Sequence, residues 1–403
     1  MAQAALPFEP VSGESFIPRP FASSHPNVPS GAPADPVAHA IGQDFARHRL
    51  APPVAHLHAE SPVLQGWQAA RSLPGLRTRD ANAAVKHWLN LRLQAWLNGT
   101  AFEDVQVTPA YLRRLGGTLC PVTRTALTAD PTRPAVAHVV RINRRAAVAG
   151  GNLAALSPQA DLALQSHDWL QAIGQASALD AAAGAEHLGL TSPQWRRLAV
   201  LASFVTPLAH ATAASLPLVV LPPAGLRVLN PAQALQVMLT LVFLHAGYAR
   251  RLVSLSSLMP NAEVRQAFHV FMHTLLARRL SLGPAIDRPS LRHALEDAWC
   301  DVLVQRRWQR LALRLTPTDC ERILRLADQR GWATPGVQWI AEGPAQEGWA
   351  LHDDQPNIAP SSGSSALALA RVDPAAPAPA AGVSAAPAPC PVARPPERAR
   401  TPN

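Results

Sequence analysis

The stretch from His138 to Asp161 holds the side chains of this sequence whose types and spacing are best suited to chemistry. It reads HVVRINRRAAVAGGNLAALSPQAD, with an imidazole at its start and a carboxylate at its end. An imidazole can activate water, and a carboxylate is an oxygen ligand for a hard cation such as Mg²⁺. In an extended strand His138 points to the same face as Val140. These residue types suit metal-assisted hydrolysis if the fold brings them together.

The spacing of this stretch resembles the HNH endonuclease family in its phage-like form. Residues 140–143, Val-Arg-Ile-Asn, occupy the positions of the family's D-R-I-D, and residues 151–153 match its G-N-L. Residues 157–161 continue in register. Upstream, residues 119–128, LCPVTRTALT, resemble the family's C-P-x-x-G-x-x-L, with Arg124 in place of the glycine. The resemblance covers about 50 of the 403 residues.

The resemblance implies a ββα module over residues 115–170, in which a hairpin and a helix hold one divalent metal against the scissile phosphate. This chain departs from the pattern at the ligands. Val140 stands at the strand ligand position and cannot bind a metal. Arg141 stands where many members carry the histidine base, and a guanidinium stays protonated. Asp161 alone remains as a ligand, so the resemblance implies a degenerate, non-catalytic module.

We therefore expect a hairpin whose turn is bridged by the side chain of Asn152. Across the vestigial site we expect Val140 and Asp161 to approach each other, with no paired imidazole or second carboxylate within ligand reach. No cofactor is expected. A divalent metal would matter only if nuclease activity survives with His138 as the replacement group.

Nucleic acid remains a possible partner without any metal, because guanidinium groups bind phosphate oxygens. DNA is the expected ligand, and the expected contacts are Arg113, Arg114, Arg141, Arg144 and Arg145. The alternative is that a Gly-Gly-Asn turn between a short strand and an Ala-rich helix is ordinary loop structure, unrelated to HNH proteins.

A second group of candidate ligands lies in the C-terminal half. His269 and His273 are four residues apart, and His293 and Glu296 are three apart, so that each pair would share a helix face. The residue after His269 is Val270, not the glutamate of a zinc protease motif. We expect these side chains to be hydrated surface groups and predict no metal site.

Tryptophans in the same half could stack on nucleic-acid bases, but aromatic side chains at helical spacing belong more often to a core. We predict that the following are core residues: Trp195, Trp299, Trp308, Trp332 and Trp339.

Most of the chain carries helical signals, and we predict a mainly α fold, a helical bundle with the small ββα module. Asp80 is expected to cap a helix that extends to Asn98, and two further helices are expected at 261–280 and 290–314. Four pairs of a capping residue and proline predict helix starts: Thr108-Pro109, Ser192-Pro193, Asn230-Pro231 and Thr316-Pro317.

The order of these signals predicts five parts. A proline-rich arm over residues 1–60 and an Ala/Pro-rich tail over 343–403 are expected to be disordered. Between them we expect a helical segment over 61–114, the ββα module over 115–170, and a helical domain over 171–342.

Composition limits the class of protein. The net charge is +9 and Lys86 is the only lysine, an arginine bias typical of GC-rich bacterial genes. The arginines are spread along the chain, so the charge gives only weak support for a polyanionic partner. Four cysteines without a C-x-x-C pair predict neither disulfides nor a zinc ribbon. A cytoplasmic protein without a secretory signal is the expected class.

Two uncharged stretches, 198–226 and 228–249, raise the question of a membrane hairpin. Prolines and polar residues interrupt both stretches, and neither holds the unbroken apolar run of about 20 residues that spans a bilayer. We predict buried helices and no membrane span.

Two classes of function follow. The first is a non-catalytic protein that binds nucleic acid through the degenerate HNH-like module, with active metal-dependent nuclease chemistry as its less favoured form. The second is a helical interaction or scaffold protein without enzymatic activity, whose partners are proteins bound by the helical domain and the tails.

Overall fold

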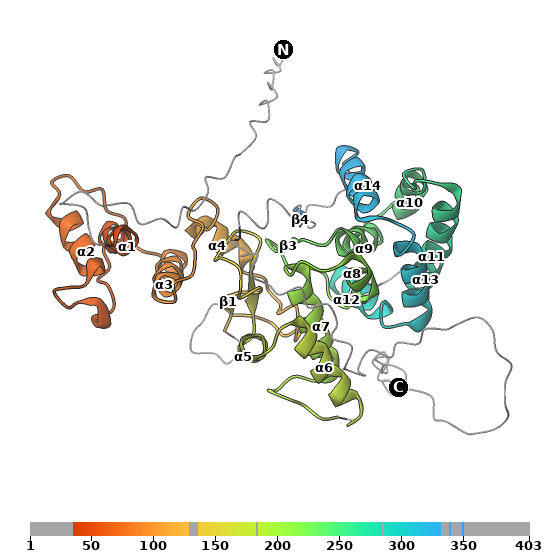
Figure 1. Cartoon of the computed structure of the whole chain (residues 1–403), viewed down its shortest axis with the longest axis horizontal. Helices are drawn as coiled ribbons and strands as arrows, with labels where there is room; N and C mark the ends of the chain where they lie inside the picture. The colour runs from red at the N-terminus through yellow and green to blue at the C-terminus, as the bar shows by residue number, and fades with distance from the viewer. Residues whose placement is uncertain are drawn as a thin grey trace, which may run out of the picture. The chain divides into compact units, whose positions relative to one another are not determined.

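Helices make up most of the residues that the structure describes, as predicted for the fold class (Figure 1). The structure is a computed structural model that describes residues 35–128, 136–182, 184–283, 286–331, 338–339 and 349. Within these residues the helices are α1 (Pro36–Arg47), α2 (Pro62–Ser72), α3 (Ala83–Leu97), α4 (Pro109–Leu115), α5 (Pro158–Ser166), α6 (Trp169–Asp180), α7 (Ser192–Phe204), α8 (His210–Ser215), α9 (Pro231–Val242), α10 (Tyr248–Ser256), α11 (Ala262–Ser281), α12 (Arg288–Ala298), α13 (Val302–Ala312) and α14 (Pro317–Gln329). The strands are β1 (His138–Arg141), β2 (Leu153–Leu156), β3 (Arg227–Val228) and β4 (Gln338–Trp339).

Helices α1 and α2 pack at very short range because a glycine stands at each crossing point. A Cβ atom on Gly42 would lie 2.0 Å from the carbonyl oxygen of Val63, and one on Gly66 would lie 1.9 Å from that of His39. Only glycine fits at both places, since it carries no Cβ atom. Helix α3 completes this part of the fold. The three helices share a small core, which includes Ile41, Phe45, Val63, Leu89 and Leu93.

The predicted disordered arm over residues 1–60 is wrong for residues 36–47 and 54–56, which fold as α1 and a short 3-10 helix. Ile41 and Phe45 lie one helical turn apart on the buried face of α1, and the carboxylate of Asp35 caps its N-terminus. The sequence prediction missed this short amphipathic helix because the rest of the segment is rich in proline. Residues 1–34 of the arm, and all of the predicted tail except Trp349, lie outside the described residues.

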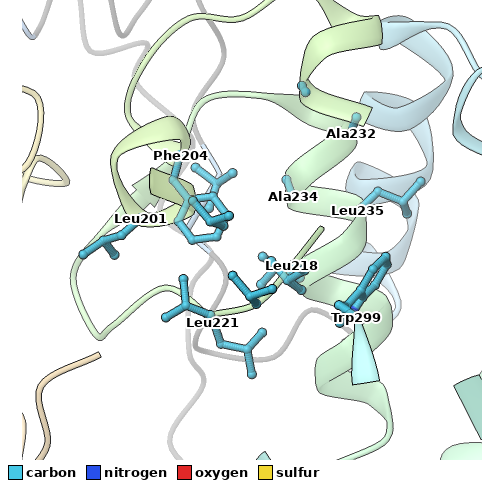
Figure 2. Packing of buried hydrophobic residues seen from close by; sticks show 14 of the residues in the cluster. Leu201, Phe204, Leu218, Leu221, Ala232, Ala234, Leu235 and Trp299 are labelled. Carbon is cyan, nitrogen blue, oxygen red and sulfur yellow. The ribbon is translucent and has the colours of Figure 1, made fainter. Parts of the chain in front are cut away.

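The two uncharged stretches of the sequence supply the centre of the largest hydrophobic core. They contain the second half of α7 and all of α8 and α9, and most apolar side chains of these segments are buried. Figure 2 shows the packing of Leu201 and Phe204 from α7, Leu218 and Leu221 from the loop before β3, Ala232, Ala234 and Leu235 from α9, and Trp299. Among the described residues no helix is both long and apolar enough to cross a membrane. The stretches are hydrophobic because they fill a protein interior.

The predicted boundary between a ββα module and a separate helical domain does not correspond to a gap in the packing. Cys120, Ile142 and Leu156, from the segment that contains the hairpin, belong to the same core cluster as Trp195 and Leu235. The hairpin and helix therefore fold against the helical bundle rather than as an isolated unit.

The tryptophan prediction is confirmed for the described side chains. Trp195, Trp299 and Trp308 are each at most 1% exposed. The rings of Trp299 and Trp308 meet edge to face at 5.6 Å, and both contact Phe271. Trp332 and the side chain of Trp339 lie outside the described residues.

Several predicted helix starts are confirmed. Thr108 and Thr316 accept backbone hydrogen bonds as N-caps, each followed by proline in the first helical turn. Helix α9 begins at Pro231, with Asn230 at the N-cap position. The side chain of Asn230, however, forms no capping hydrogen bond with α9. Its amide donates instead to the carbonyl oxygens of Ser203 and Thr206.

Other helix ends differ from the predictions by one to three residues. Asn82, not Asp80, caps α3, and Asp80 lies at the surface in an exposed ion pair with Arg49. Helix α7 is capped by Thr191 and begins at Ser192. The helix predicted at 290–314 is two helices, since the chain turns after Trp299 and Asp301 caps α13.

Near its C-terminus the described chain returns to the hairpin. Strand β4 pairs in parallel with β3, whose Arg227 donates its backbone N–H to the carbonyl oxygen of Gly151. Trp349 is buried, and its indole N–H donates to the carbonyl oxygen of Gly150 at 3.2 Å. Trp349 thus contradicts the predicted start of the disordered tail at residue 343, because it is anchored on the hairpin turn.

Candidate functional site

Strands β1 and β2 and helix α5 form a ββα arrangement (Figure 1). The strands pair antiparallel, with His138 opposite Leu156 and Arg141 opposite Leu153. Ser157 caps α5 through its hydroxyl, and Pro158 follows in the first turn. This short connection from β2 brings the first turn of α5 beside the start of β1.

His138 and Asp161 meet directly at this junction. Nδ1 of His138 lies 2.8 Å from Oδ2 of Asp161, and the amide of Gln165 donates to Oδ1 of Asp161 at 3.1 Å. The His138 side chain is 40% exposed, whereas that of Asp161 is 13% exposed. A hydrogen bond from Nδ1–H to the carboxylate leaves Nε2 as the ring nitrogen free to accept a proton. The pair therefore has the geometry of an oriented imidazole base.

The expectation that no imidazole lies within reach of Asp161 is wrong. Val140 packs against the large core, and His138 is the strand residue that reaches Asp161. The strand register is the reason. His138 lies opposite Leu156, just before the cap of α5, whereas Val140 lies opposite Ala154, two residues further from the helix.

A third titratable side chain, His87 of α3, lies near this pair. Burial and the positive charge of His138 both lower the pKa of His87. Nε2 of His87 is buried without a hydrogen-bond partner in the structure as described. Sequence reasoning missed His87, because a helix residue so distant along the chain carries no local signal. In the described part of the chain, no group of three His, Cys, Asp or Glu side chains is arranged to hold a metal ion.

The segment before β1 forms a tight turn around Cys120. The backbone N–H of Arg124 donates to the carbonyl oxygen of Cys120, and that of Cys120 donates to Thr125. Arg124 has a φ of 60°, in the left-handed region that favours glycine. This is the position at which the HNH pattern carries glycine. Sγ of Cys120 accepts from the backbone N–H of Ser157 at 3.3 Å, so the turn contacts the start of α5.

Asn152 bridges the hairpin turn, as predicted. Its Oδ1 accepts from the backbone N–H of Asn143 at 2.8 Å, and its Nδ2 donates to the carbonyl oxygens of Asn143 and Ala147. The residue is fully buried. Gly151 before it has a φ of 97°, a conformation that side-chain-bearing residues rarely adopt. Asn152 is therefore a structural residue of the turn.

Helix α4 and the loop before it form hydrogen bonds with the backbone of this turn. The hydroxyl of Tyr111 accepts from the backbone N–H of Gly151 at 3.0 Å and donates to the carbonyl oxygen of Gly225. Glu103, in the loop before α4, accepts from the backbone N–H of Gly150. Fixed from several sides, the turn is a rigid support for neighbouring side chains.

The five predicted nucleic-acid contacts fall into two groups. Arg141 is half-buried and donates to the carbonyl oxygen of Ala146, and burial together with the charge of Arg144 lowers its pKa. Arg144 is exposed and uses one N–H group to bind the carbonyl oxygen of Gln165. The other exposed members are Arg113, Arg114 and Arg145. Arg141 therefore supports the turn, and the other four arginines are exposed to solvent.

The second group of candidate ligands is not brought together in the described structure. Nε2 of His269 lies 2.8 Å from the hydroxyl of Ser256, and the ring of His273 lies beside that of His269. Glu296 was predicted to be a hydrated surface residue, but it is 2% exposed and accepts hydrogen bonds from Arg124 and from Arg292. Its carboxylate is thus occupied within the protein.

Comparison of the chain with protein-family models, with curated proteins and with solved structures finds no match.

Proposed function

We propose that this protein binds nucleic acid through the phosphate backbone, with the ββα module and α4 as a non-catalytic platform. One observation carries the proposal. Four exposed arginines flank the rigid hairpin turn, and none of them forms a salt bridge with a carboxylate of the described chain: Arg113, Arg114, Arg144 and Arg145.

The physical basis is the geometry of the guanidinium group. It stays charged and presents several N–H donors that match the oxygens of a phosphate. Arg113 and Arg114 lie on α4, which contacts the turn through Tyr111, and Arg144 and Arg145 belong to the turn itself. Backbone contacts of this kind carry no sequence information, so binding should be strongly salt-dependent and weakly sequence-dependent.

Fluorescence anisotropy with a labelled DNA duplex over a series of salt concentrations tests the proposal. Each lost phosphate contact reduces the slope of log affinity against log salt by about 0.9. Alanine at all four flanking arginines should therefore lower the slope by about three to four units. The matched control removes four exposed arginines elsewhere, Arg77, Arg306, Arg310 and Arg325, with the same change in net charge. An equal loss in the control contradicts the proposal.

A wild-type protein that binds no DNA at low salt also contradicts it. Protein partners that survive nuclease treatment in a pull-down, without any DNA binding, would favour the helical scaffold function instead.

Phosphodiester hydrolysis is a second candidate, favoured specifically by the His138–Asp161 pair. His138 would accept the proton of an attacking water at Nε2, and Asp161 would orient the imidazole. With both nitrogens of His138 used in this step, a divalent metal would have only the Asp161 carboxylate as a ligand from the described site, so substrate oxygens and water would have to complete its coordination. Nicking of supercoiled plasmid with Mg²⁺ or Mn²⁺ by the wild type, but not by His138→Ala or Asp161→Asn, would support this activity. Equal nicking by all three proteins would identify a contaminant.

A further inference from the structure

A second cationic surface lies on the helical bundle, where α9 turns into α10. The chain between them forms a shallow hollow lined by Ala246, Gly247, Ala249, Arg250, Arg251 and Ser254. Gly247 has a φ of 75°, which allows α10 to start immediately after the turn. The nearby helix α12 begins at Arg288, which is exposed.

Three segments bring positive groups together at this surface. Burial, and then the charges of Arg251 and Arg288, lower the pKa of His245 in the turn. Arg250 is exposed, and Arg279 of α11 reaches over the ring of Tyr248 at the start of α10. No salt bridge within the described structure involves Arg250, Arg251 or Arg288.

Like charges held together without counter-ions repel one another, and an anionic ligand would relieve that repulsion. Some exposed arginines elsewhere in the bundle have carboxylate partners, as in the pairs Arg278–Asp301 and Arg314–Glu263. At the α10 surface, Arg250 and Arg251 line the hollow and Arg251 and Arg288 both lie near His245, so that the unpaired positive groups of this surface are gathered in one place.

The shape and polarity of the surface indicate the class of anion. On α10, Leu255 is buried and Leu252 packs against the core, so Val253 is the one large apolar side chain that the helix exposes. A helix that inserts into a lipid interface needs a whole apolar face, which α10 does not present to solvent. The hollow is open and would not enclose a small anion. An extended polyanion can contact several spaced guanidinium groups at once.

We propose that Arg250, Arg251 and Arg288 form a second contact surface for the phosphate backbone of nucleic acid, on the helical bundle and distinct from the arginines of the hairpin turn. The identity of the polyanion rests on the proposed function. The inference that an anionic partner binds this surface does not rest on the proposed function, because it follows from the unpaired charges of the surface itself.

The test compares three full-length proteins in the same DNA anisotropy titration. These are the wild type, the variant with Arg250, Arg251 and Arg288 changed to alanine, and a control with Arg306, Arg310 and Arg325 changed to alanine. The three control arginines are exposed. The first variant should bind about tenfold more weakly at low salt, with a salt slope lower by about two to three units. The control should stay within about twofold, and lysine at the three proposed positions should retain most of the slope.

The outcomes separate this inference from the proposed function. If only the variant of the four turn arginines loses binding, the inference is overturned and the proposed function stands. If only the variant of Arg250, Arg251 and Arg288 loses DNA binding, the inference stands and the proposed function of the hairpin turn is overturned. Absence of DNA binding by the wild type overturns both. Binding to phosphatidylglycerol vesicles that depends on the three arginines, with unchanged DNA binding, would also overturn the inference. Circular dichroism and thermal unfolding of each variant show whether the fold is retained.

Discussion

The guanidinium of Arg124 lies 3.0 Å from the buried carboxylate of Glu296, so that an ion pair joins the turn before β1 to helix α12. Burial disfavours the charged form of Arg124, but hydrogen bonds and charges from Asp297 and Glu296 outweigh it and raise its pKa. The other oxygen of Glu296 accepts from Arg292 and from the backbone N–H of Leu221. This one carboxylate connects three parts of the chain.

Replacing Glu296 with alanine should lower the free energy of unfolding by about 3–5 kcal/mol, because buried donors lose their acceptor. Urea denaturation measures the change. Asp297→Ala is the control, since Asp297 also pairs with Arg124 but its side chain is 57% exposed. The control should cost no more than about 1 kcal/mol. Equal losses of stability in the two variants would show that burial is not the reason for the contribution of Glu296 to stability.

Asn152→Ala should destabilise the protein by about 3 kcal/mol, because it removes three hydrogen bonds and leaves buried backbone groups unpaired. Asn90→Ala, at an exposed position of α3, should change stability by less than about 0.5 kcal/mol. If Asn152→Ala unfolds at the same urea concentration as the wild type, the turn does not depend on this bridge.

Gly42→Ala should destabilise the protein by at least about 2–3 kcal/mol, because the new methyl group meets the backbone of α2 at 2.0 Å. Gly174→Ala should change the stability in the opposite direction. Gly174 lies inside α6 and a Cβ atom there meets nothing within 4 Å, so alanine should stabilise by up to about 1 kcal/mol through its helix propensity. Thermal unfolding measures both. A neutral effect at Gly42 would refute the close helix crossing.

The pH dependence of stability should report on His87. Its pKa is lowered in the folded protein, so the unfolded chain binds the proton more readily. Its contribution is therefore present above the ordinary histidine pKa of about 6.5 and is lost as the pH falls from there through the lowered value. Urea unfolding on both sides of that pH should show a smaller loss for His87→Leu than for the wild type. His39→Leu is the matched control, and an identical loss in His87→Leu and the wild type would exclude a role for His87.

Local signals in the sequence were sufficient for several features. Thr108 and Thr316 cap their helices, and Asn152 bridges its turn, because these effects act between residues a few positions apart. The burial of the tryptophans and of the uncharged stretches follows from hydrophobicity alone. Where neighbouring residues compete for the same role, local signals fail. Both Asp80 and Asn82 are suited to cap α3, and in the structure Asn82 does so while Asp80 pairs with Arg49 at the surface.

The candidate site itself depended on tertiary structure. Alternation along β1 placed His138 and Val140 on one face, but only the pairing of His138 with Leu156 decided that His138 contacts Asp161. The position of His87 beside this pair, and the burial of Glu296 against Arg124, likewise arise from contacts between separate elements. Periodicity determines which way a side chain points from its own element. What it meets there depends on strand register and helix packing, which are set by the free energy of the whole core.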